Sequence, residues 1–302
     1  MNWRGVMPAI TTCFNEDLSI DHGFVAQHGK WLIDQGCTGI ITPGSLGEGA
    51  TLTFDEKVAL WQTCVTAAGE TAPVVAAISA LSAAEAVELA KRAADQGCQG
   101  LMALPPYVYR GDWREMKAYV SAVMRATDLS CMLYNNPVAY GTDFLPEHIE
   151  ELAGEHENFH AVKESSTDAR RVTAIRALVG DRLAVFVGVD DAIVEGVAAG
   201  ATGWVAGLVN AFPAESVALF DYAMAGEREK AFELYKWFLP LLRMDTVPKF
   251  VQLIKLAQEE VGMGNARVRP PRLELTGEEL EHARATIRRA LNNRPLLSGS
   301  SR

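Results

Sequence analysis

A single lysine of this chain occupies a position that favours covalent chemistry. Lys163 ends the mostly apolar run 159–162 and is followed at once by the polar residues 164–166. Such a run predicts a buried β-strand, so the amine lies at a strand end and is partly desolvated. Desolvation favours the neutral amine, and a neutral amine attacks a carbonyl carbon whereas an ammonium ion cannot. The alternative is a lysine whose stem packs at the strand end while its charge reaches solvent.

Polar residues at three further predicted strand ends are candidates for the same site. Tyr134 can both donate and accept a proton, although a core aromatic with a bonded hydroxyl is the alternative. The loop 43–49 sets glycines around Ser45 and exposes backbone N–H groups that can hold an anion, or it is a plain tight turn. The segment 188–191 offers two aspartates, which bind hydroxyl groups or cap the next helix.

An internal repeat governs the elements that must position these residues. The segment 34–41 recurs closely as 95–102 and more loosely as 199–205. Each copy ends a helix with glycine, turns and enters a buried strand, which is the helix-to-strand junction of a βα array. Eight apolar runs without strict alternation predict parallel strands covered on both faces. They are 5–12, 39–42, 74–79, 100–104, 130–134, 160–163, 184–188 and 203–208.

Eight strand–helix units in 302 residues predict an α/β protein with the (β/α)8 TIM barrel fold. Residues 1–226 are expected to form the barrel as a catalytic domain, and residues 227–302 a C-terminal helical extension packed on it. A doubly wound open sheet is the alternative, but the phosphate-binding G-x-G-x-x-G does not follow the first strand. In such barrels the active site lies at the carboxyl ends of the strands, where Ser45, Tyr134 and Lys163 fall.

Composition excludes several classes of partner. The net charge of −10 and the pI near 5.2, without a basic run, argue against nucleic-acid binding. No apolar stretch is long and clean enough to span a membrane, and the first residues lack the apolar core of a secretion signal. The five cysteines form no C-x-x-C pair, and neither they nor the six histidines show metal-ligand spacing. A cytoplasmic protein with buried free thiols and no metal is expected.

Three loops together resemble one known family. A G-S-x-G-E loop at 44–48, Y-N-x-P at 134–137 and V-K-E-S at 162–165 are similar to the dihydrodipicolinate synthase / N-acetylneuraminate lyase family of class I aldolases. The resemblance covers residues 5–289. It implies that Lys163 condenses with the carbon of a 2-oxo acid or ring imine while Tyr134 shuttles protons. No cofactor is implied, and a homo-oligomer, tetramer or dimer, is expected.

The same resemblance implies where the substrate binds. Ser45, with the N–H groups of Ser45 and Leu46, would hold the substrate carboxylate, and Ser45 is counted with Lys163 and Tyr134 as catalytic. The remaining contacts are expected from the glycines and carboxylates at the ends of the second, seventh and eighth strands. The predicted substrate-binding residues are Gly44, Ser45, Leu46, Gly188, Asp190, Asp191 and Gly207.

Departures from the family pattern narrow the expected substrate. The synthase branch has an arginine two residues after the proline of Y-N-x-P, where this chain has Ala139. It also has a tyrosine pair after the fourth strand, whose second member is replaced here by Val108. The second hydroxyl of its G-T-T-G-E loop is lost at Leu46. These changes argue against lysine-pathway synthase activity.

Two other branches agree better with the sequence. The sialic-acid lyase branch binds sugar hydroxyls with a motif close to 188–191, but Gly207 replaces its small hydroxyl residue, and Trp204 and Leu208 predict a bulkier, more apolar region. The segments 134–141 and 204–210 look like the bacterial hydroxyproline-degradation branch. The best expectation is therefore a 1-pyrroline-4-hydroxy-2-carboxylate deaminase, which forms 2-oxoglutarate semialdehyde and ammonia. The alternatives are a 2-keto-3-deoxy sugar acid dehydratase or aldolase and, in another class, a non-catalytic barrel that binds 2-oxo acids.

Overall fold

Eight strands form one parallel sheet in the computed structural model, which describes residues 1–68 and 71–297. Their order is β1-β8-β7-β6-β5-β4-β3-β2, and each strand runs parallel to its neighbours. The strands are β1 Gly5–Pro8, β2 Ile40–Thr42, β3 Val74–Ile78, β4 Gly100–Ala103, β5 Ser130–Asn135, β6 Phe159–Glu164, β7 Ala184–Val187 and β8 Gly203–Ala206. All eight predicted strands are confirmed.

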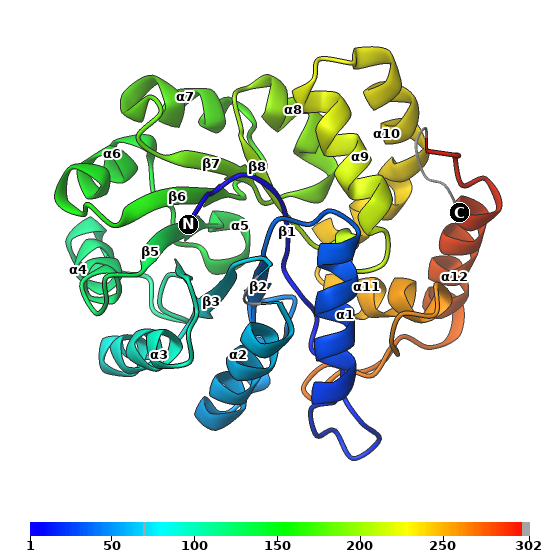
Figure 1. Cartoon of the computed structure of the whole chain (residues 1–302), viewed down its shortest axis with the longest axis horizontal. Coiled ribbons are helices and arrows are strands. Elements are labelled where there is room, and N and C mark those ends of the chain that lie inside the picture. The colour runs from blue at the N-terminus through cyan, green and yellow to red at the C-terminus, as the bar shows by residue number, and fades with distance from the viewer. Residues whose placement is uncertain (69–70, 298–302) are drawn as a thin grey trace.

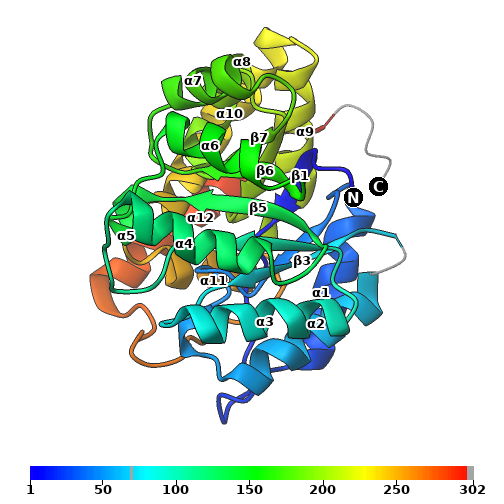
Figure 2. The same cartoon turned by 90° about the vertical axis from the view of Figure 1, so that its left-hand side faces the viewer.

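The two ends of this sheet meet and close the barrel. Ala9 forms a parallel bridge to Ile41, and the N–H of Ile10 donates to the carbonyl of Ile41 at 3.0 Å. Figure 1 shows the helices arranged around the strands, and Figure 2 shows α5 (Pro137–Tyr140) at the opposite end of β5 from the N-terminus. The protein is therefore a (β/α)8 TIM barrel, as predicted.

Helices alternate with the strands. The barrel helices are α1 His22–Asp34, α2 Phe54–Ala68, α3 Ala83–Asp95, α4 Trp113–Met124, α6 Pro146–Glu155, α7 Arg170–Val179, α8 Ile193–Ala198 and α9 Pro213–Met224, with 3-10 turns η1 Gly49–Thr51, η2 Asp190–Ala192 and η3 Leu208–Asn210. Their starts follow local side-chain chemistry, because Asp112 and Glu115 form a reciprocal capping box at α4 and Thr53 and Glu56 do so before α2.

The first strand ends earlier than its apolar run predicts. It stops at Pro8 rather than at Thr12. Ala9 and Ile10 still donate to carbonyls of β8 and β2, but Thr11 and Thr12 bond to neighbouring loops instead of to a sheet partner. The N–H of Thr11 donates to Asn210 Oδ1 at 3.2 Å, and Thr12 Oγ1 donates to the carbonyl of Gly47 at 2.7 Å. This segment therefore links the loops at the carboxyl ends of β2 and β8.

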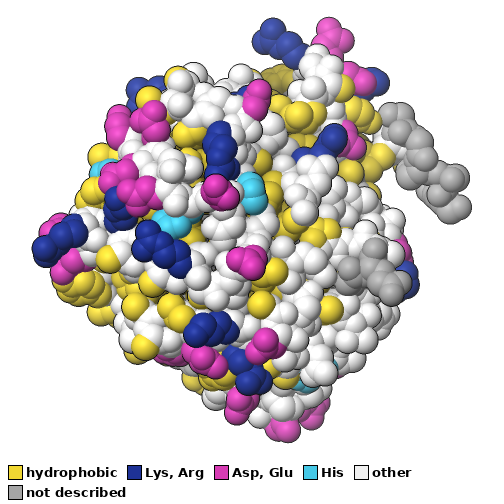
Figure 3. All heavy atoms as spheres, turned by 60° about the vertical axis from the view of Figure 1, so that its left-hand side comes forward, with side chains coloured by type: hydrophobic (Ala, Val, Ile, Leu, Met, Phe, Trp, Pro, Cys, Tyr) yellow, Lys and Arg dark blue, Asp and Glu magenta, His cyan; other side chains and the backbone are white. Residues whose placement is uncertain are grey.

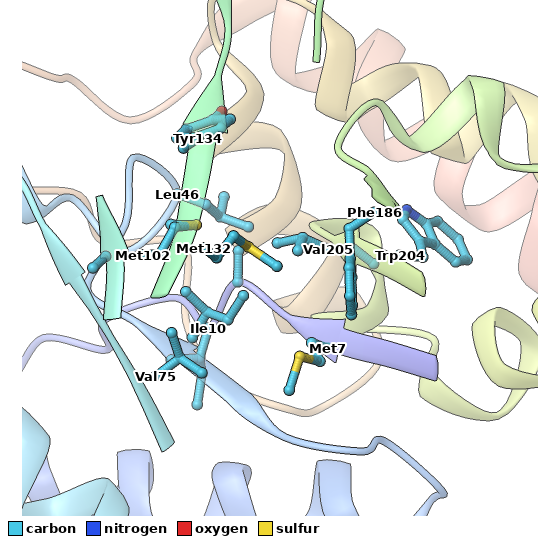
Figure 4. Packing of buried hydrophobic residues seen from close by; sticks show 14 of the residues in the cluster. Met7, Ile10, Leu46, Val75, Met102, Met132, Tyr134, Phe186, Trp204 and Val205 are labelled. Carbon is cyan, nitrogen blue, oxygen red and sulfur yellow. The ribbon is translucent and has the colours of Figure 1, made fainter. Parts of the chain in front are cut away.

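The barrel interior is a packed apolar core. Figure 4 shows Met7, Ile10, Met132 and Val205 directed into it, with Tyr134 at its upper edge. All five cysteines are buried and free, and burial raises the pKa of Cys37, Cys64, Cys98 and Cys131 to about 12, so these thiols stay neutral. The expectation that they are small core residues is confirmed.

Three helices follow the barrel helices in the chain. They are α10 Arg228–Leu242, α11 Phe250–Glu260 and α12 Gly277–Asn292, and the 3-10 turn η4 Arg243–Thr246 connects the first two. Phe212 packs edge-on against Trp237, and Thr11 Oγ1 donates to Gln258 Oε1 of α11 at 2.8 Å. Treating residues 227–302 as a separate extension stays a prediction, and residues 298–302 lie outside the described part.

The surface carries charges of both signs. Figure 3 shows basic and acidic side chains interspersed over one face of the barrel. Within residues 1–68 and 71–297, no helix combines the length and apolar character that crossing a membrane requires.

Candidate active site

Lys163 and Tyr134 lie side by side at the carboxyl ends of β6 and β5. The two residues are register partners in the sheet, and Lys163 Nζ lies 4.1 Å from the centroid of the Tyr134 ring. Lys163 is 7 % exposed and has no ion pair with a carboxylate of the described residues. Its other register partner is Phe186, whose ring is apolar. The amine is thus held in a largely apolar wall with a phenol beside it.

The loop after β2 is shaped by close backbone approaches. A Cβ at Gly47 would lie 2.8 Å from the carbonyl oxygen of Ile10, and one at Gly49 would lie 2.5 Å from that of Pro43. The backbone N–H groups of Ser45 and Leu46 donate to no acceptor within residues 1–68 and 71–297. Two free donors beside a hydroxyl suit an oxyanion such as a carboxylate.

Gly44 and the Leu46 side chain both have structural roles in this loop. Gly44 is buried, and its carbonyl accepts a hydrogen bond from the N–H of Gly49 at 3.0 Å, which closes the turn. A Cβ at Gly44 would lie 3.7 Å from Met102 Cε, an ordinary contact, so no close approach requires glycine there. The Leu46 side chain is buried in the core. Gly44 therefore shapes the loop, and direct contact of Gly44 with a substrate stays a prediction.

A buried ion pair between Glu48 and Lys255 stabilises this loop. Glu48 has a left-handed φ of 56°, and its carboxylate accepts a hydrogen bond from Lys255 Nζ at 2.8 Å and one from the N–H of Arg269 at 2.9 Å. Lys255 lies on α11, so the loop is tied to the helices that follow the barrel. The Arg269 guanidinium also forms hydrogen bonds with Glu56, which fixes the segment after α11 to the start of α2.

The turn after β5 brings in a second phenol that sequence reasoning missed. Asn136 accepts from the N–H of Ala139 at 2.9 Å and donates to the Tyr134 hydroxyl at 2.9 Å, which fixes α5 against β5. The Tyr140 ring lies edge-on to the Tyr134 ring, and its hydroxyl is hydrogen-bonded to Ser45 Oγ. Burial, with the neighbouring phenols Tyr134 and Tyr107, raises the pKa of Tyr140 well above its usual value.

Small residues at the ends of β6 and β7 make room around the lysine. A Cβ at Gly188 would lie 2.6 Å from Lys163 Cε and 2.0 Å from Ser165 Oγ, so this position accepts only glycine. Ser165 is 2 % exposed, and its hydroxyl has no hydrogen-bond partner in the described part of the chain. It therefore presents a free polar atom beside the reactive amine.

Asp190 is engaged with the end of β8. It accepts hydrogen bonds from Trp204 Nε1 at 3.0 Å, from the N–H of Gly207 at 3.1 Å and from the N–H of Leu208 at 2.8 Å. Burial raises its pKa to about 6, although these donors and Lys163 act in the other direction. Asp190 does not cap the next helix, and binding of substrate by Asp190 stays a prediction. The Trp204 indole lies behind Asp190 rather than lining the barrel interior, because Val205 faces inward (Figure 4).

Gly207 and Asp191 contact residues from the segment after α10. A Cβ at Gly207 would lie 2.1 Å from Asp245 Oδ1, so the Asp245 carboxyl group occupies the space that the missing side chain leaves. The Asp191 carbonyl accepts from the Tyr235 hydroxyl, and its carboxylate lies 3.5 Å from Arg243 Nε. No local sequence signal points to Asp245, because it lies 82 positions from Lys163 in the chain.

Two of the positions that depart from the family pattern, Val108 and Ala139, are exposed. Val108 is 93 % exposed with a φ of 70°, and the Tyr109 hydroxyl donates to Glu115 at 3.0 Å. Ala139 is exposed, and the guanidinium of the exposed Arg110 packs against Gly141 in the same turn. Over the ranges that the structure describes, no three His, Cys, Asp or Glu side chains are grouped to hold a metal ion.

The arrangement combines an amine, phenols, a loop with two free N–H donors and buried carboxyl groups. The structure brings together Lys163 and Tyr134, and it places Ser45 within reach of Tyr134 through Tyr140. Asp190 and Asp245 lie on the β7–β8 side of Lys163 and interact with it electrostatically. Such a set can form an imine at the lysine and move protons on either side of it.

Comparison with known proteins gives consistent relatives. Residues 2–290 match the Dihydrodipicolinate synthetase family. The chain is 27% identical to the 4-hydroxy-tetrahydrodipicolinate synthase of Desulforamulus reducens, covering 97% of each chain, and 30% identical to that of Haloarcula marismortui, covering 95% of this chain and 94% of the relative. The crystal structure of a dihydrodipicolinate synthase from Bacillus anthracis is 28% identical, with a TM-score of 0.92 over 98% of this chain and 100% of the other.

Proposed function

Because the chain belongs to the Dihydrodipicolinate synthetase family of class I aldolase-type enzymes, we propose that it is a Schiff-base-forming deaminase acting on a small cyclic 2-imino acid. The best substrate is 1-pyrroline-4-hydroxy-2-carboxylate, and the products are 2-oxoglutarate semialdehyde and ammonia. One observation carries the proposal. The amine of Lys163 is buried against Tyr134 without an ion-pair partner among the described residues, and carboxyl groups rather than cations lie on the far side of it.

The proposed reaction begins with addition of the Lys163 amine to C2 of the ring imine. The C2–N bond to the ring nitrogen then breaks, so the ring opens and the substrate is held as an iminium on Lys163. Tyr134 transfers protons from the lysine nitrogen to the departing nitrogen, since its hydroxyl both donates and accepts a proton. Loss of a proton from C3 gives an enamine, which expels the 4-hydroxyl group as water. Loss of a proton from C5 and gain of one at C3, with a proton shift from nitrogen to C4, then convert the C5 amine into an imine. Hydrolysis of the two C=N bonds releases the semialdehyde, ammonia and free Lys163.

The substrate carboxylate is assigned to the loop after β2. Ser45 and the free N–H groups of Ser45 and Leu46 can hold one carboxylate beside the lysine. A second carboxylate on the β7–β8 side would meet the Asp190 carboxylate, and like charges at short range are unfavourable. This favours a monocarboxylate and disfavours condensation with an acidic aldehyde, although the names of the relatives above describe a synthase. Arg110 is the cation to test for that rival, and Arg110→Ala is expected to leave the KM for a monocarboxylate unchanged.

The first experiment tests the covalent mechanism with pyruvate as the probe. Incubation with pyruvate and borohydride is expected to add the mass of the reduced adduct to Lys163, which peptide mass spectrometry locates. The Lys163→Ala variant is the control and should gain no adduct. Absence of an adduct in folded wild-type protein would remove the Schiff-base mechanism and favour a binding protein.

The second experiment tests the substrate. Ammonia release from 1-pyrroline-4-hydroxy-2-carboxylate is compared with water loss from 2-keto-3-deoxy sugar acids, which are the substrates of the main alternative. We expect ammonia release to have the larger kcat/KM. Reaction of the sugar acids alone would contradict the deaminase and leave a dehydratase of the same mechanism. Cleavage of the sugar acids to pyruvate would instead indicate an aldolase.

The assembly of the protein and its location in the cell are proposed from the family resemblance. We expect a cytoplasmic homo-oligomer, a tetramer or dimer, because that is what the family resemblance implies. Light scattering of the purified protein measures its mass, and a single 32.8 kDa species at working concentration would contradict the expectation.

A further inference from the structure

We propose that Asp245 is the acid that protonates the group leaving from the lysine-bound substrate, so that the enzyme takes 2-oxo or cyclic 2-imino acids with a hydroxyl on the carbon β to the imine carbon. This inference rests on the proposed Schiff-base function of Lys163. It adds a catalytic residue from outside the strand-end loops and makes elimination, rather than carbon–carbon cleavage, the reaction of the site.

Asp245 occupies the space that is left free because residue 207 is a glycine. Asp245 lies in η4, and its Oδ1, Cγ and Oδ2 atoms would be 2.1, 2.5 and 2.8 Å from a Cβ at Gly207. Gly207 directly follows β8, and its N–H is bonded to Asp190. The carboxyl group of Asp245 therefore reaches over the end of β8 to the β7–β8 side of the barrel mouth.

Free polar atoms mark this side as one that receives a substrate group. Asp245 Oδ1 is buried and has no hydrogen-bond partner among the described residues. Ser165 Oγ is likewise buried and free within the same ranges, and it lies next to Lys163 across Gly188. Buried polar atoms in folded proteins are nearly always paired, so two orphaned oxygen atoms beside the same lysine call for a ligand.

The charges around Asp245 favour its protonated form. The groups that act on it are Lys163 of β6, Asp190 and Asp191 of η2, and, one step away, Arg243, which is paired with Asp191. Burial and the two aspartates outweigh Lys163 and raise the pKa of Asp245 well above its usual value. A carboxyl group that keeps its proton is a donor, and the Asp190 carboxylate is occupied by Trp204, Gly207 and Leu208.

The direction of proton transfer separates two reactions of the lysine-bound substrate, elimination from its enamine and aldol cleavage from its iminium. In elimination, the nitrogen lone pair of the enamine re-forms C=N⁺, the C2=C3 double bond moves to C3=C4, and the C4–O bond breaks. The oxygen takes the proton of Asp245 and leaves as water, and Asp245 becomes a carboxylate that solvent reprotonates. In aldol cleavage the same hydroxyl must instead lose a proton to a base. A protonated Asp245 serves only the first reaction.

The test separates formation of the adduct from its breakdown. In Asp245→Asn, trapping of pyruvate on Lys163 by borohydride should be unchanged, because the oxygen lost in that step leaves C2 beside Tyr134, and pyruvate carries no 4-hydroxyl. Water loss from two probes that carry a 4-hydroxyl, 1-pyrroline-4-hydroxy-2-carboxylate and a 2-keto-3-deoxy sugar acid, should fall by about 10²- to 10⁴-fold in kcat, the usual contribution of a positioned acid. Wild-type kcat should fall as pH rises through the pKa of Asp245, and the variant should lose that limb.

A matched control is Asp221→Asn. Burial also raises the pKa of Asp221, but it lies on α9 near Arg4, and kcat should stay unchanged. Thermal unfolding checks that Asp245→Asn remains folded, which is expected because an amide is neutral, as the protonated carboxyl group is, and has nearly the same shape.

The outcomes distinguish this inference from the proposed function. If wild-type protein fails to trap pyruvate, the Schiff-base function is wrong. If it traps pyruvate and Asp245→Asn keeps kcat within about threefold, or keeps the alkaline limb, only the role of Asp245 is overturned. Trapping of pyruvate without water loss from either probe also overturns it, as does cleavage of the sugar acid to pyruvate at an undiminished rate in the variant.

Discussion

Two buried lysines of this chain look alike and differ in one contact. Lys163 is 7 % exposed and lies 4.1 Å from the centroid of the Tyr134 ring, and Lys255 is 1 % exposed and lies 4.4 Å from that of Phe14. Lys255, however, donates to Glu48 at 2.8 Å, whereas Lys163 has no ion pair within the described ranges. The paired amine is held as a charged structural group, and the unpaired one is left available to a substrate.

The comparison shows that burial and an aromatic neighbour do not make a lysine reactive. A carboxylate at hydrogen-bond distance stabilises the ammonium ion and occupies its donors. Around Lys163 the carboxyl groups of Asp190 and Asp245 interact with it only at longer range, and Asp190 is held by other donors. The same chain therefore uses one lysine to brace the loop that holds Ser45 and another to face it.

Removing Lys163 should mainly affect turnover, and removing Lys255 should mainly affect stability. Lys163→Ala is expected to lower turnover by roughly 10⁴- to 10⁶-fold, the scale seen when a covalent nucleophile is lost, while thermal unfolding stays close to wild type. Steady-state kinetics and a melting curve measure the two effects. Retained turnover would remove the covalent mechanism, and an unfolded variant would assign Lys163 a structural role.

Lys255→Ala should act mainly on stability. It leaves the carboxylate of Glu48 buried without its main partner, which costs about 3–5 kcal/mol of unfolding free energy. Urea denaturation measures the change, with Lys30→Ala as a control. The exposed Lys30–Asp34 pair is expected to contribute less than about 0.5 kcal/mol. Equal stability of the two variants would show that the Glu48–Lys255 pair does not support the fold.

Two buried groups, His28 and Asp190, should make the stability of the protein depend on pH in opposite directions. Burial lowers the pKa of His28 to about 4, so folding loses stability as pH falls from about 6.5 towards 4, because the unfolded chain binds the proton more readily. Burial raises the pKa of Asp190 to about 6, so the folded protein binds this proton more tightly than the unfolded chain does. Folding therefore loses stability as pH rises from about 3.8 to 6. Each effect reaches about 3 kcal/mol, at about 1.4 kcal/mol per pKa unit.

These two contributions oppose each other in wild-type protein between about pH 4 and 6. His28→Gln should remove one of them, so the unfolding free energy of the variant should fall as pH rises through this range. Urea denaturation at several pH values measures it. A variant whose stability rises with pH as steeply as that of wild type would contradict the assignment to His28.

The smallest expected effect concerns the placement of Ser45. Tyr140→Phe removes the hydroxyl that is bonded to Ser45 Oγ, at a cost of about 0.5–1.5 kcal/mol in transition-state binding. The kcat/KM should therefore fall by about 2- to 12-fold. Tyr109→Phe is the matched control, since that phenol is exposed and bonded to Glu115. Indistinguishable kcat/KM values for the two variants would show that Tyr140 does not position Ser45.

Local sequence patterns predicted most of the fold. The glycine-ended helices and apolar runs predicted all eight strands, because each strand is short, buried on both faces and bounded by turn residues. The ends were less accurate where the chain leaves the ladder for a tertiary contact, as after Pro8, where Thr11 and Thr12 bond to loops of other strands. The capping pairs Thr53–Glu56 and Asp112–Glu115 also follow local sequence, since capping depends on residues three apart.

By itself, the sequence determined the barrel and the strand ends from which Lys163, Tyr134 and Ser45 project, because apolar runs and turn chemistry act over a few residues. Only the tertiary structure decided which lysine is paired, since Glu48 and Lys255 lie 207 positions apart. It alone also brought Tyr140 to Ser45 and Asp245 to Gly207. Partners so distant in the chain leave no local pattern, and electrostatic environment depends on distance in space rather than along the sequence.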